Sequence, residues 1–351
     1  MAAVIDLAKF AFTKEELTSV KDLVYEGILQ SPELALFCTI HEGIKFNKDV
    51  GFVGPGGLVG KAGQGCNPTA QSWNIVTRKI TWAPADWEVF LKHCYKDLET
   101  TIGIYSLKTG IQRADFTSSD YMAIIVDFLI EGIKDMMLRL AFFGDTAADV
   151  IANGGKLTAG TDKDFFTLID GFFKQITVAY TANAKQRVTI SENAGANYAA
   201  QALVEANVQG YLKSLTAKAS PLLKQMDGNI IICTQSFYEA YKGSLQGTSI
   251  ESMYVNLVTG VKTLSYDGKP LIPVPEFDAL IEAYYDNGTK LDNPHRAIYT
   301  NPGVLAVGVD EMGNFAEVDV WYDKTDRNVY SLSTGKIDAK LADPKLVQIA
   351  I

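Results

Sequence analysis

The sequence has little of the chemistry on which most enzymes and disulfide-rich scaffolds depend. Its 351 residues include 3 histidines and 4 cysteines. So few imidazoles limit general acid–base catalysis near neutral pH. Four cysteines in a chain of this length do not make a disulfide scaffold. We therefore expect reduced cysteines, as in a cytoplasmic protein, and no catalytic site built on histidine.

Long apolar runs are also missing. The first residues, MAAVIDLAKF, lack the basic segment and the apolar run of a secretory signal. Charged residues interrupt the most apolar stretch, 121–143: Asp127, Glu131, Lys134, Asp135 and Arg139. A bilayer core excludes charges at this density. We expect neither export nor a membrane span.

Positive charge is in deficit. Lysine and arginine number 32 against 41 acidic residues, which gives a formal net charge of −9. Sequence-specific readers of nucleic acid usually carry a basic surface, and an acidic surface repels DNA. The composition is otherwise that of a globular protein, with 47% hydrophobic and 21% charged residues. A chain of this length exceeds what one compact core usually needs, so we expect at least two packed lobes.

Motifs for nucleotide binding fail on their spacing. A phosphate loop that ends at Gly60-Lys61 requires glycine where Pro55 stands, and Ala62 supplies no hydroxyl for magnesium. A dinucleotide-binding pattern fails because Val59 occupies the position of its third glycine. The G-x-S-x-G motif of hydrolases is not in the sequence. We assign no catalytic and no cofactor-binding residues.

A zinc site is a weaker alternative. Cys38-x-x-His41 has a spacing at which two side chains can share one ion, and Cys66 with His93-Cys94 would complete the ligands. The second pair is adjacent instead of spaced, and Cys66 lies in a glycine-rich run. We therefore assign no metal ligand and keep a metal-dependent enzyme as an alternative.

The first third of the chain predicts an arm and a long hairpin. Residues 13–30 have the periodicity of a surface helix. Residues 51–68 contain seven glycines and two prolines, a composition that is extended or mobile unless an outside surface holds it. The β-branched and aromatic flanks predict a hairpin over 43–83. Residues 84–99 predict a short helix.

The strongest helix signal covers residues 117–143, and Gly144 is expected to end the helix. At this length the helix would be about 40 Å long. Shorter helices are predicted at 164–175, at 195–226 with a break at Pro221, and at 235–245. Strands are predicted at 230–233, at 261–264 and 271–274 around the Asp267-Gly268 turn, and at 315–322.

The chain runs from a short arm through a long glycine-tipped hairpin and a long helix to a mixed α+β region. This order of parts resembles that of the major capsid proteins of tailed bacteriophages, which have the Hong Kong 97-type fold. Leu264–Pro275, LSYDGKPLIPVP, resembles the hairpin of the axial domain. Ala297–Glu311, AIYTNPGVLAVGVDE, resembles the passage that returns to the spine helix. Asp164–Ile176, DFFTLIDGFFKQI, is similar to the segment that enters the peripheral domain after the spine helix. The resemblance covers residues 20–340.

The resemblance implies an α+β fold with a defined order of domains. They are an N-terminal arm (1–42), an extended β-hairpin loop (43–88), a peripheral domain (89–192) with the spine helix at 117–143, an axial domain (193–310), and C-terminal strands (311–351) that return to the peripheral domain. It also implies which residues serve assembly. They are Gly54, Gly56, Gly57, Gly60 and Gly63 at the loop tip, Trp73 and Trp82, which should anchor the return strand, and Leu129, Ile133 and Leu140, which should pack the spine helix onto the peripheral sheet.

The function that the resemblance implies is structural and not enzymatic. Subunits would self-assemble into pentamers and hexamers of an icosahedral virion capsid around double-stranded DNA, within the host cytoplasm. Expected partners are other copies of the chain, a separate scaffolding protein (because the arm begins near Met1), a portal and decoration proteins. The packaged DNA would make no sequence-specific contact. An encapsulin-like shell of a bacterial nanocompartment has the same fold and is the alternative.

Overall fold

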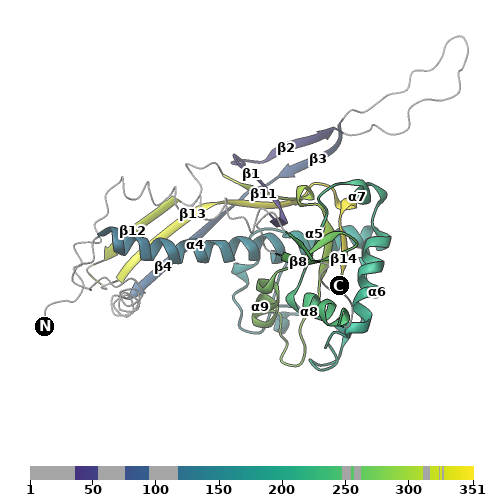
Figure 1. The fold of residues 1–351 in the computed structure, drawn as a ribbon. Coiled ribbons are helices and arrows are strands. Elements are labelled where there is room, and N and C mark those ends of the chain that lie inside the picture. Colours follow the sequence, from purple (N-terminus) through teal and green to yellow (C-terminus); the bar gives the residue numbers. More distant parts are fainter. Residues whose placement is uncertain are drawn as a thin grey trace, which may run out of the picture.

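The computed structural model describes residues 36–53, 76–94, 118–246, 254–256, 262–310, 317–323, 325 and 328–351. Figure 1 shows three parts: an elongated wing of one long helix beside a sheet, a compact lobe around a second sheet, and a projecting hairpin. Of the helices in these ranges, none combines the length and the hydropathy that a membrane-spanning segment requires.

The wing is built on one sheet with a long central strand. Its strands are β1 (Thr39–His41), β4 (Ala85–Cys94), β11 (Leu305–Val309), β12 (Glu317–Asp323) and β13 (Asn328–Leu341). Strand β13 pairs antiparallel with β4 on one side, and with β12 and then β11 on the other. Strand β1 extends the sheet by running parallel to β11. The predicted strand at 315–322 is confirmed as β12.

The predicted helix at 84–99 is wrong, because residues 85–94 form strand β4. Burial alternates along this strand: Trp87 is buried and Leu91 half-buried, whereas Glu88 and Phe90 are exposed. This period of two matches a half-buried strand. Ten consecutive residues pair with β13, and this long-range ladder decides the conformation.

The predicted long helix is confirmed as α4 (Ser118–Phe143), and it lies along one face of the wing sheet (Figure 1). Gly144 ends it as expected. A Cβ atom at Gly144 would lie 2.5 Å from the carbonyl oxygens of both Ile169 and Leu140, so only glycine fits this close turn.

The helix predicted at 164–175 lies further along the chain. A 3-10 turn covers Lys163–Phe165, and helix α5 covers Phe172–Ala182. Asp170 accepts hydrogen bonds from the backbone N–H and the hydroxyl of Thr146, at 2.9 and 2.8 Å, which holds the loop before α5. Within 195–226, helix α6 (Glu205–Lys218) starts later than predicted, and Pro221 opens α7 (Pro221–Gln225) at a position that suits proline.

The compact lobe contains a seven-stranded mixed sheet. Its order is β5 (Arg187–Val188), β14 (Gln348–Ala350), β10 (Ala297–Thr300), β6 (Ile230–Cys233), β9 (Lys269–Pro273), β8 (Lys262–Tyr266) and β7 (Tyr254–Asn256). The predicted strand at 230–233 and the hairpin at Asp267-Gly268 are confirmed. Both turn residues have positive φ, 52° and 73°, as a tight two-residue hairpin requires.

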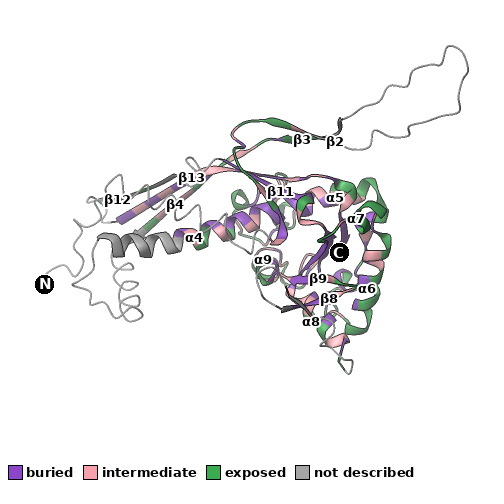
Figure 2. Cartoon of the chain, turned by 45° about the horizontal axis from the view of Figure 1, so that its top comes forward, coloured by how far each residue is buried: buried purple, intermediate pink, exposed green. Residues whose placement is uncertain are grey.

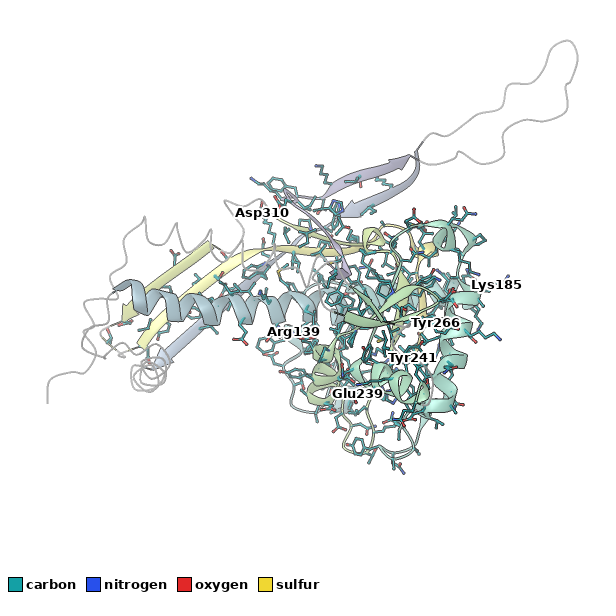
Figure 3. All side chains as sticks on the ribbon, viewed as in Figure 1. Arg139, Lys185, Glu239, Tyr241, Tyr266 and Asp310 are labelled. Atoms are coloured by element: carbon teal, nitrogen blue, oxygen red, sulfur yellow. The ribbon has the colours of Figure 1, made fainter. Side chains whose placement is uncertain are left out.

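Helices cover both faces of this second sheet. Helices α6 and α8 (Gln235–Ser244, as predicted from 235–245) pack on one face through Leu212 and Phe237. Tyr241 of α8 meets Tyr266 edge-on, with ring centroids 6.2 Å apart (Figure 3). The other face joins α5, α9 (Pro275–Tyr284) and the end of α4 in the main core.

The main core runs without interruption from the wing into the lobe (Figure 2). Phe142 and Phe143 at the end of α4 meet Phe173 of α5 and Phe277 of α9, and the rings of Phe142 and Phe277 are 4.7 Å apart. Aromatic contacts of this kind add to the stabilisation from buried area. The end of the long helix is therefore the joint between the two parts.

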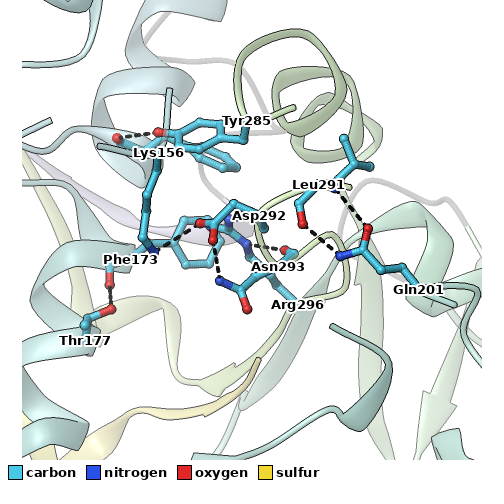
Figure 4. A network of polar contacts seen from close by, with 10 residues as sticks. Lys156, Phe173, Thr177, Gln201, Tyr285, Leu291, Asp292, Asn293 and Arg296 are labelled. Carbon is cyan, nitrogen blue, oxygen red and sulfur yellow. Dashed lines mark hydrogen bonds and ion pairs between the residues drawn. The ribbon is translucent and has the colours of Figure 1, made fainter. Parts of the chain in front are cut away.

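A buried arginine completes this joint (Figure 4). The guanidinium of Arg296 lies 4.6 Å from the ring centre of Phe173 and 5.1 Å from that of Phe143. It donates to the carbonyl oxygens of Asn293 and Asp292 at 2.9 and 3.0 Å. Burial lowers its pKa. Its hydrogen bonds tie the loop before β10 to the aromatic cluster.

Candidate assembly surfaces

The hairpin is the first surface on which no other described strand lies. Strands β2 (Lys48–Val53) and β3 (Val76–Trp82) pair with each other and with no other described strand, and Figure 1 shows them leaving the body. Lys79 and Thr81 reach Asp49 across the pair, at 2.5 and 2.8 Å, and lower the pKa of its carboxyl. An isolated pair of strands is marginally stable in water, so contact with a further surface would stabilise this hairpin.

The base of the hairpin is anchored within its own chain. Trp82 is 2% exposed and packs with Ile44, Ile80 and Ala306. Its ring lies 5.7 Å from that of His41. This burial fits the anchoring position that the sequence predicts for Trp82, and its effect on assembly stays a prediction.

The remaining predicted assembly residues fall into two groups. Five glycines and one tryptophan lie outside the described residues: Gly54, Gly56, Gly57, Gly60, Gly63 and Trp73. By contrast, Leu129, Ile133 and Leu140 of α4 are 1%, 0% and 3% exposed and belong to the main core. Such burial supports their predicted packing role. Their effect on assembly stays a prediction.

The second uncovered surface is the face of the wing sheet opposite α4. Phe90 of β4, Tyr330 of β13 and Trp321 of β12 form a ladder across three strands. Phe90 and Tyr330 stack at 5.5 Å with 12° between ring planes, and Trp321 stacks on Tyr330 at 5.5 Å. Phe90 is 53% exposed and Trp321 is 40% exposed. Exposed aromatic groups of this size on a sheet mark an interaction surface.

Acidic residues flank this aromatic ladder. Around the ladder, alternation along the strands places Asp86, Glu88, Asp319 and Asp323 on the same face as the rings. Lys92 above the Tyr330 ring and Lys336 opposite Asp86 share that face. The surface is therefore aromatic with a net negative charge. This surface is not predicted from the sequence, because residues 84–99 favour a helix there; the alternation in Trp87–Leu91 is the local signal for a strand.

Cys38 is a described member of the zinc site that the sequence leaves as an alternative. No group of three or more histidine, cysteine or acidic side chains lies close enough to hold a metal within the described part of the chain. Cys38 is buried, and burial raises the pKa of its thiol to about 12. A zinc-bound cysteine is a thiolate, so this environment opposes metal binding. Cys66 lies outside the described residues.

Comparison with solved structures identifies the fold. The chain matches one in the structure of the satellite phage P4 procapsid with its size determination (Sid) protein, with a TM-score of 0.51 and 11% identity over 95% of this chain and 97% of that one. It also matches a chain of Gordonia phage Cozz, with a TM-score of 0.50 and 13% identity over 91% and 84% of the two chains. This chain therefore has the fold of phage capsid proteins.

Other similarities are weaker or missing. The SrpI encapsulin of Synechococcus elongatus PCC 7942 matches at a TM-score of 0.46 and 9% identity over 100% of this chain and 90% of that one, too distant to choose between kinds of shell. No protein-family model and no curated protein matches the sequence. Since identities at this level establish the fold alone, the function has to be argued from the surfaces.

Proposed function

We propose that this chain is a structural subunit that self-assembles into a closed icosahedral shell, as the major capsid protein of a tailed phage. The observation that carries the proposal is the hairpin β2–β3. It is anchored at its base, and beyond the base its strands pair with no other described strand. A second copy would supply the missing cover. We propose the domain boundaries given above for this subunit. We also propose that the shell consists of pentamers and hexamers and encloses double-stranded DNA.

The aromatic ladder supports this proposal as the surface that receives the hairpin of a second copy. Segment 48–82 carries four basic residues and one acidic residue, a formal charge of +3 in a chain of net charge −9. Around the ladder, the carboxylates of Asp86, Glu88, Asp319 and Asp323 outnumber the cations Lys92 and Lys336. Opposite charges steer and orient such contacts. Segment 1–35, with six acidic and three basic residues, has the wrong sign for this face.

The first test is negative-stain electron microscopy of the purified protein with light scattering on the same sample. The proposal expects closed shells, or rings of five and six subunits. A chain that stays monomeric even when co-expressed with a scaffolding protein from the same phage genome would contradict it. Shell diameter and content separate the two kinds of shell, because a nanocompartment encloses protein cargo and a capsid encloses double-stranded DNA.

A second test addresses the docking surface by exchanging charges. Lys48 on the hairpin and Asp319 on the ladder's face are both exposed. Lys48→Glu and Asp319→Lys should each reduce the yield of shells, and the double variant should recover part of it, because each copy then carries two exchanged surfaces. Val178→Ser, at a residue 62% exposed on α5, is the matched control. Equal yields for all four variants would refute this docking mode.

A further inference from the structure

One cross-strand pair holds the root of the hairpin. Gly308 of β11 lies opposite Asp338 of β13, on the face away from α4. The Trp82 ring lies against Gly308, where a Cβ atom would be only 2.7 Å from Cζ3 of the ring. The next residue, Ala83, donates its backbone N–H to Oδ2 of Asp338 at 2.7 Å. Strand β3 therefore leaves the hairpin and meets the sheet at a single place.

The bend that follows β3 is short and stiff. Only Ala83 and Pro84 separate β3 from β4. Proline has no N–H and restricts the residue before it to extended backbone, so Ala83 carries the donor of the bend. In the described part of the chain, its bond to Asp338 ties the bend to the sheet. The angle between β3 and β4 thus depends on this carboxylate together with the packing of Trp82.

That carboxylate is almost completely buried. Asp338 is 2% exposed, and its Oδ1 accepts from the backbone N–H of Ala339 at 2.9 Å and lies 3.3 Å from Nζ of Lys340. Burial raises the pKa of Asp338 above its usual value, although these donors and Ala83 oppose the rise. The charged form therefore exists here under a desolvation cost that its donors only partly offset.

The other leg of the hairpin is held differently. Ile44 donates its backbone N–H to the carbonyl of Val309 at 3.0 Å, and Nζ of Lys336 donates to the carbonyl of Lys45 at 3.1 Å. Neither contact uses an acidic side chain. Loss of the bond at Asp338 would leave this leg attached, and the hairpin could then turn about it.

We propose that Asp338 is a protonation-dependent latch. Its carboxylate fixes the direction in which the hairpin leaves the wing sheet, and its neutralisation lets the bend at residues 83–84 open. A carboxylate accepts a charge-assisted hydrogen bond from Ala83, whereas the neutral acid accepts a weaker one and loses the attraction of Lys340. The latch concerns the single chain, so it stands or falls independently of shell formation.

Other ionisable groups surround the latch and have to be separated from it. Lys340 and Lys336 lie on the same strand as Asp338, and Lys336 is 3.6 Å from Asp86 of β4. His41 of β1 packs on the Trp82 ring, and burial lowers its pKa. His41 can therefore titrate in the same acidic range. The His41→Gln variant should keep the pH response if Asp338 causes it.

The test measures the direction of the hairpin by spin-label distances. One label is placed at Lys79→Cys, an exposed position three residues from Trp82 on β3, and the other at Lys218→Cys at the end of α6. Their separation reports the direction of the hairpin relative to the body, with Cys66 and Cys94 replaced by serine. Cys38 and Cys233 are buried at 2% and 1% exposure and need no replacement. Labelled chains are diluted into unlabelled ones. The double electron–electron resonance distribution is recorded at steps from about pH 7.5 down to about pH 3, because burial raises the pKa of Asp338 above its usual value.

The latch predicts a narrow distribution at neutral pH that broadens or shifts in acid. Asp338→Asn should show the acid distribution already at neutral pH and respond no further. Asp343→Asn, at a buried aspartate that accepts from the backbone N–H of Lys345 at 2.8 Å, is the matched control and should behave as wild type. A wild-type distribution that does not change in acid overturns the latch. So does a folded Asp338→Asn variant that behaves as wild type; if circular dichroism shows it unfolded, the wild-type titration alone decides.

Discussion

A buried glutamate in the compact lobe allows a quantitative prediction. Glu192 is 7% exposed and accepts from the hydroxyl of Tyr211 at 2.6 Å, from the amide of Asn207 at 2.8 Å and from the hydroxyl of Ser191 at 3.0 Å. Burial alone would raise its pKa, but these hydrogen bonds outweigh burial and lower the pKa from 4.5 to about 2. The fold therefore stabilises the ionised form.

The pKa shift converts into stability. A drop from 4.5 to about 2 corresponds to about 3 kcal/mol at about 1.4 kcal/mol per pKa unit. Because the folded pKa is depressed, this contribution is complete above the unfolded pKa of 4.5 and is lost as the pH falls toward 2. Glu192→Gln keeps the shape of the side chain and removes the charge. It should lower the free energy of unfolding at neutral pH by about 3 kcal/mol.

Urea denaturation followed by far-ultraviolet circular dichroism measures this effect. The deficit of Glu192→Gln should shrink as the pH is lowered from 4.5 toward 2, because the wild type loses the same contribution. Tyr211→Phe should cost about 1.5–3 kcal/mol at neutral pH, the range for a hydrogen bond to a charged group. Tyr238→Phe, in the same lobe, removes a hydroxyl that accepts from the backbone N–H of Leu264 at 3.3 Å and is the control for losing a hydrogen bond to a neutral group. A Glu192→Gln deficit that is absent at neutral pH, or that stays constant in acid, would refute the reasoning.

Three further substitutions test other parts of the fold. Gly132→Ala, in the middle of α4 with nothing within 4 Å of the added Cβ, should raise the free energy of unfolding by about 0.5–1 kcal/mol; a lower melting temperature would contradict this. Gly308→Ala should cost about 1–3 kcal/mol in a urea titration, because the added methyl displaces the Trp82 ring, and an unchanged midpoint would show that the ring moves freely. Arg296→Met should cost about 3 kcal/mol by losing the Phe173 contact and two carbonyl bonds, whereas a neutral result would mean that packing alone holds the joint.

Elements with strong local signals were predictable from the sequence. The helix at 117–143 was placed to within a residue, because its apolar stripe and the glycine after it are both local features. The turn at Asp267-Gly268 was predicted for the same reason, since its two residues adopt the positive φ angles that their side chains permit.

Elements whose conformation depends on distant partners could not be predicted from the sequence. Residues 84–99 contain residues that a helix accepts, and their conformation as a strand depends on pairing with β13, more than 200 residues further along the chain. The aromatic ladder was missed as a consequence. Phe90, Trp321 and Tyr330 come from three strands, and only their register brings the rings together. The hydrogen bond between Ala83 and Asp338 could not be predicted either, because the two residues are distant in the sequence.

The distribution of charge explains how an acidic chain can associate with itself. Copies with a net charge of −9 repel one another at long range. Docking therefore requires a segment of positive charge, and segment 48–82, with its formal charge of +3, is such a segment. In the proposed docking mode this segment lies on the sheet face of a neighbouring copy, where carboxylates surround exposed aromatic rings. The rings would then contribute desolvation energy and the carboxylates would select the partner, so a hairpin that is marginally stable by itself would gain both stability and direction.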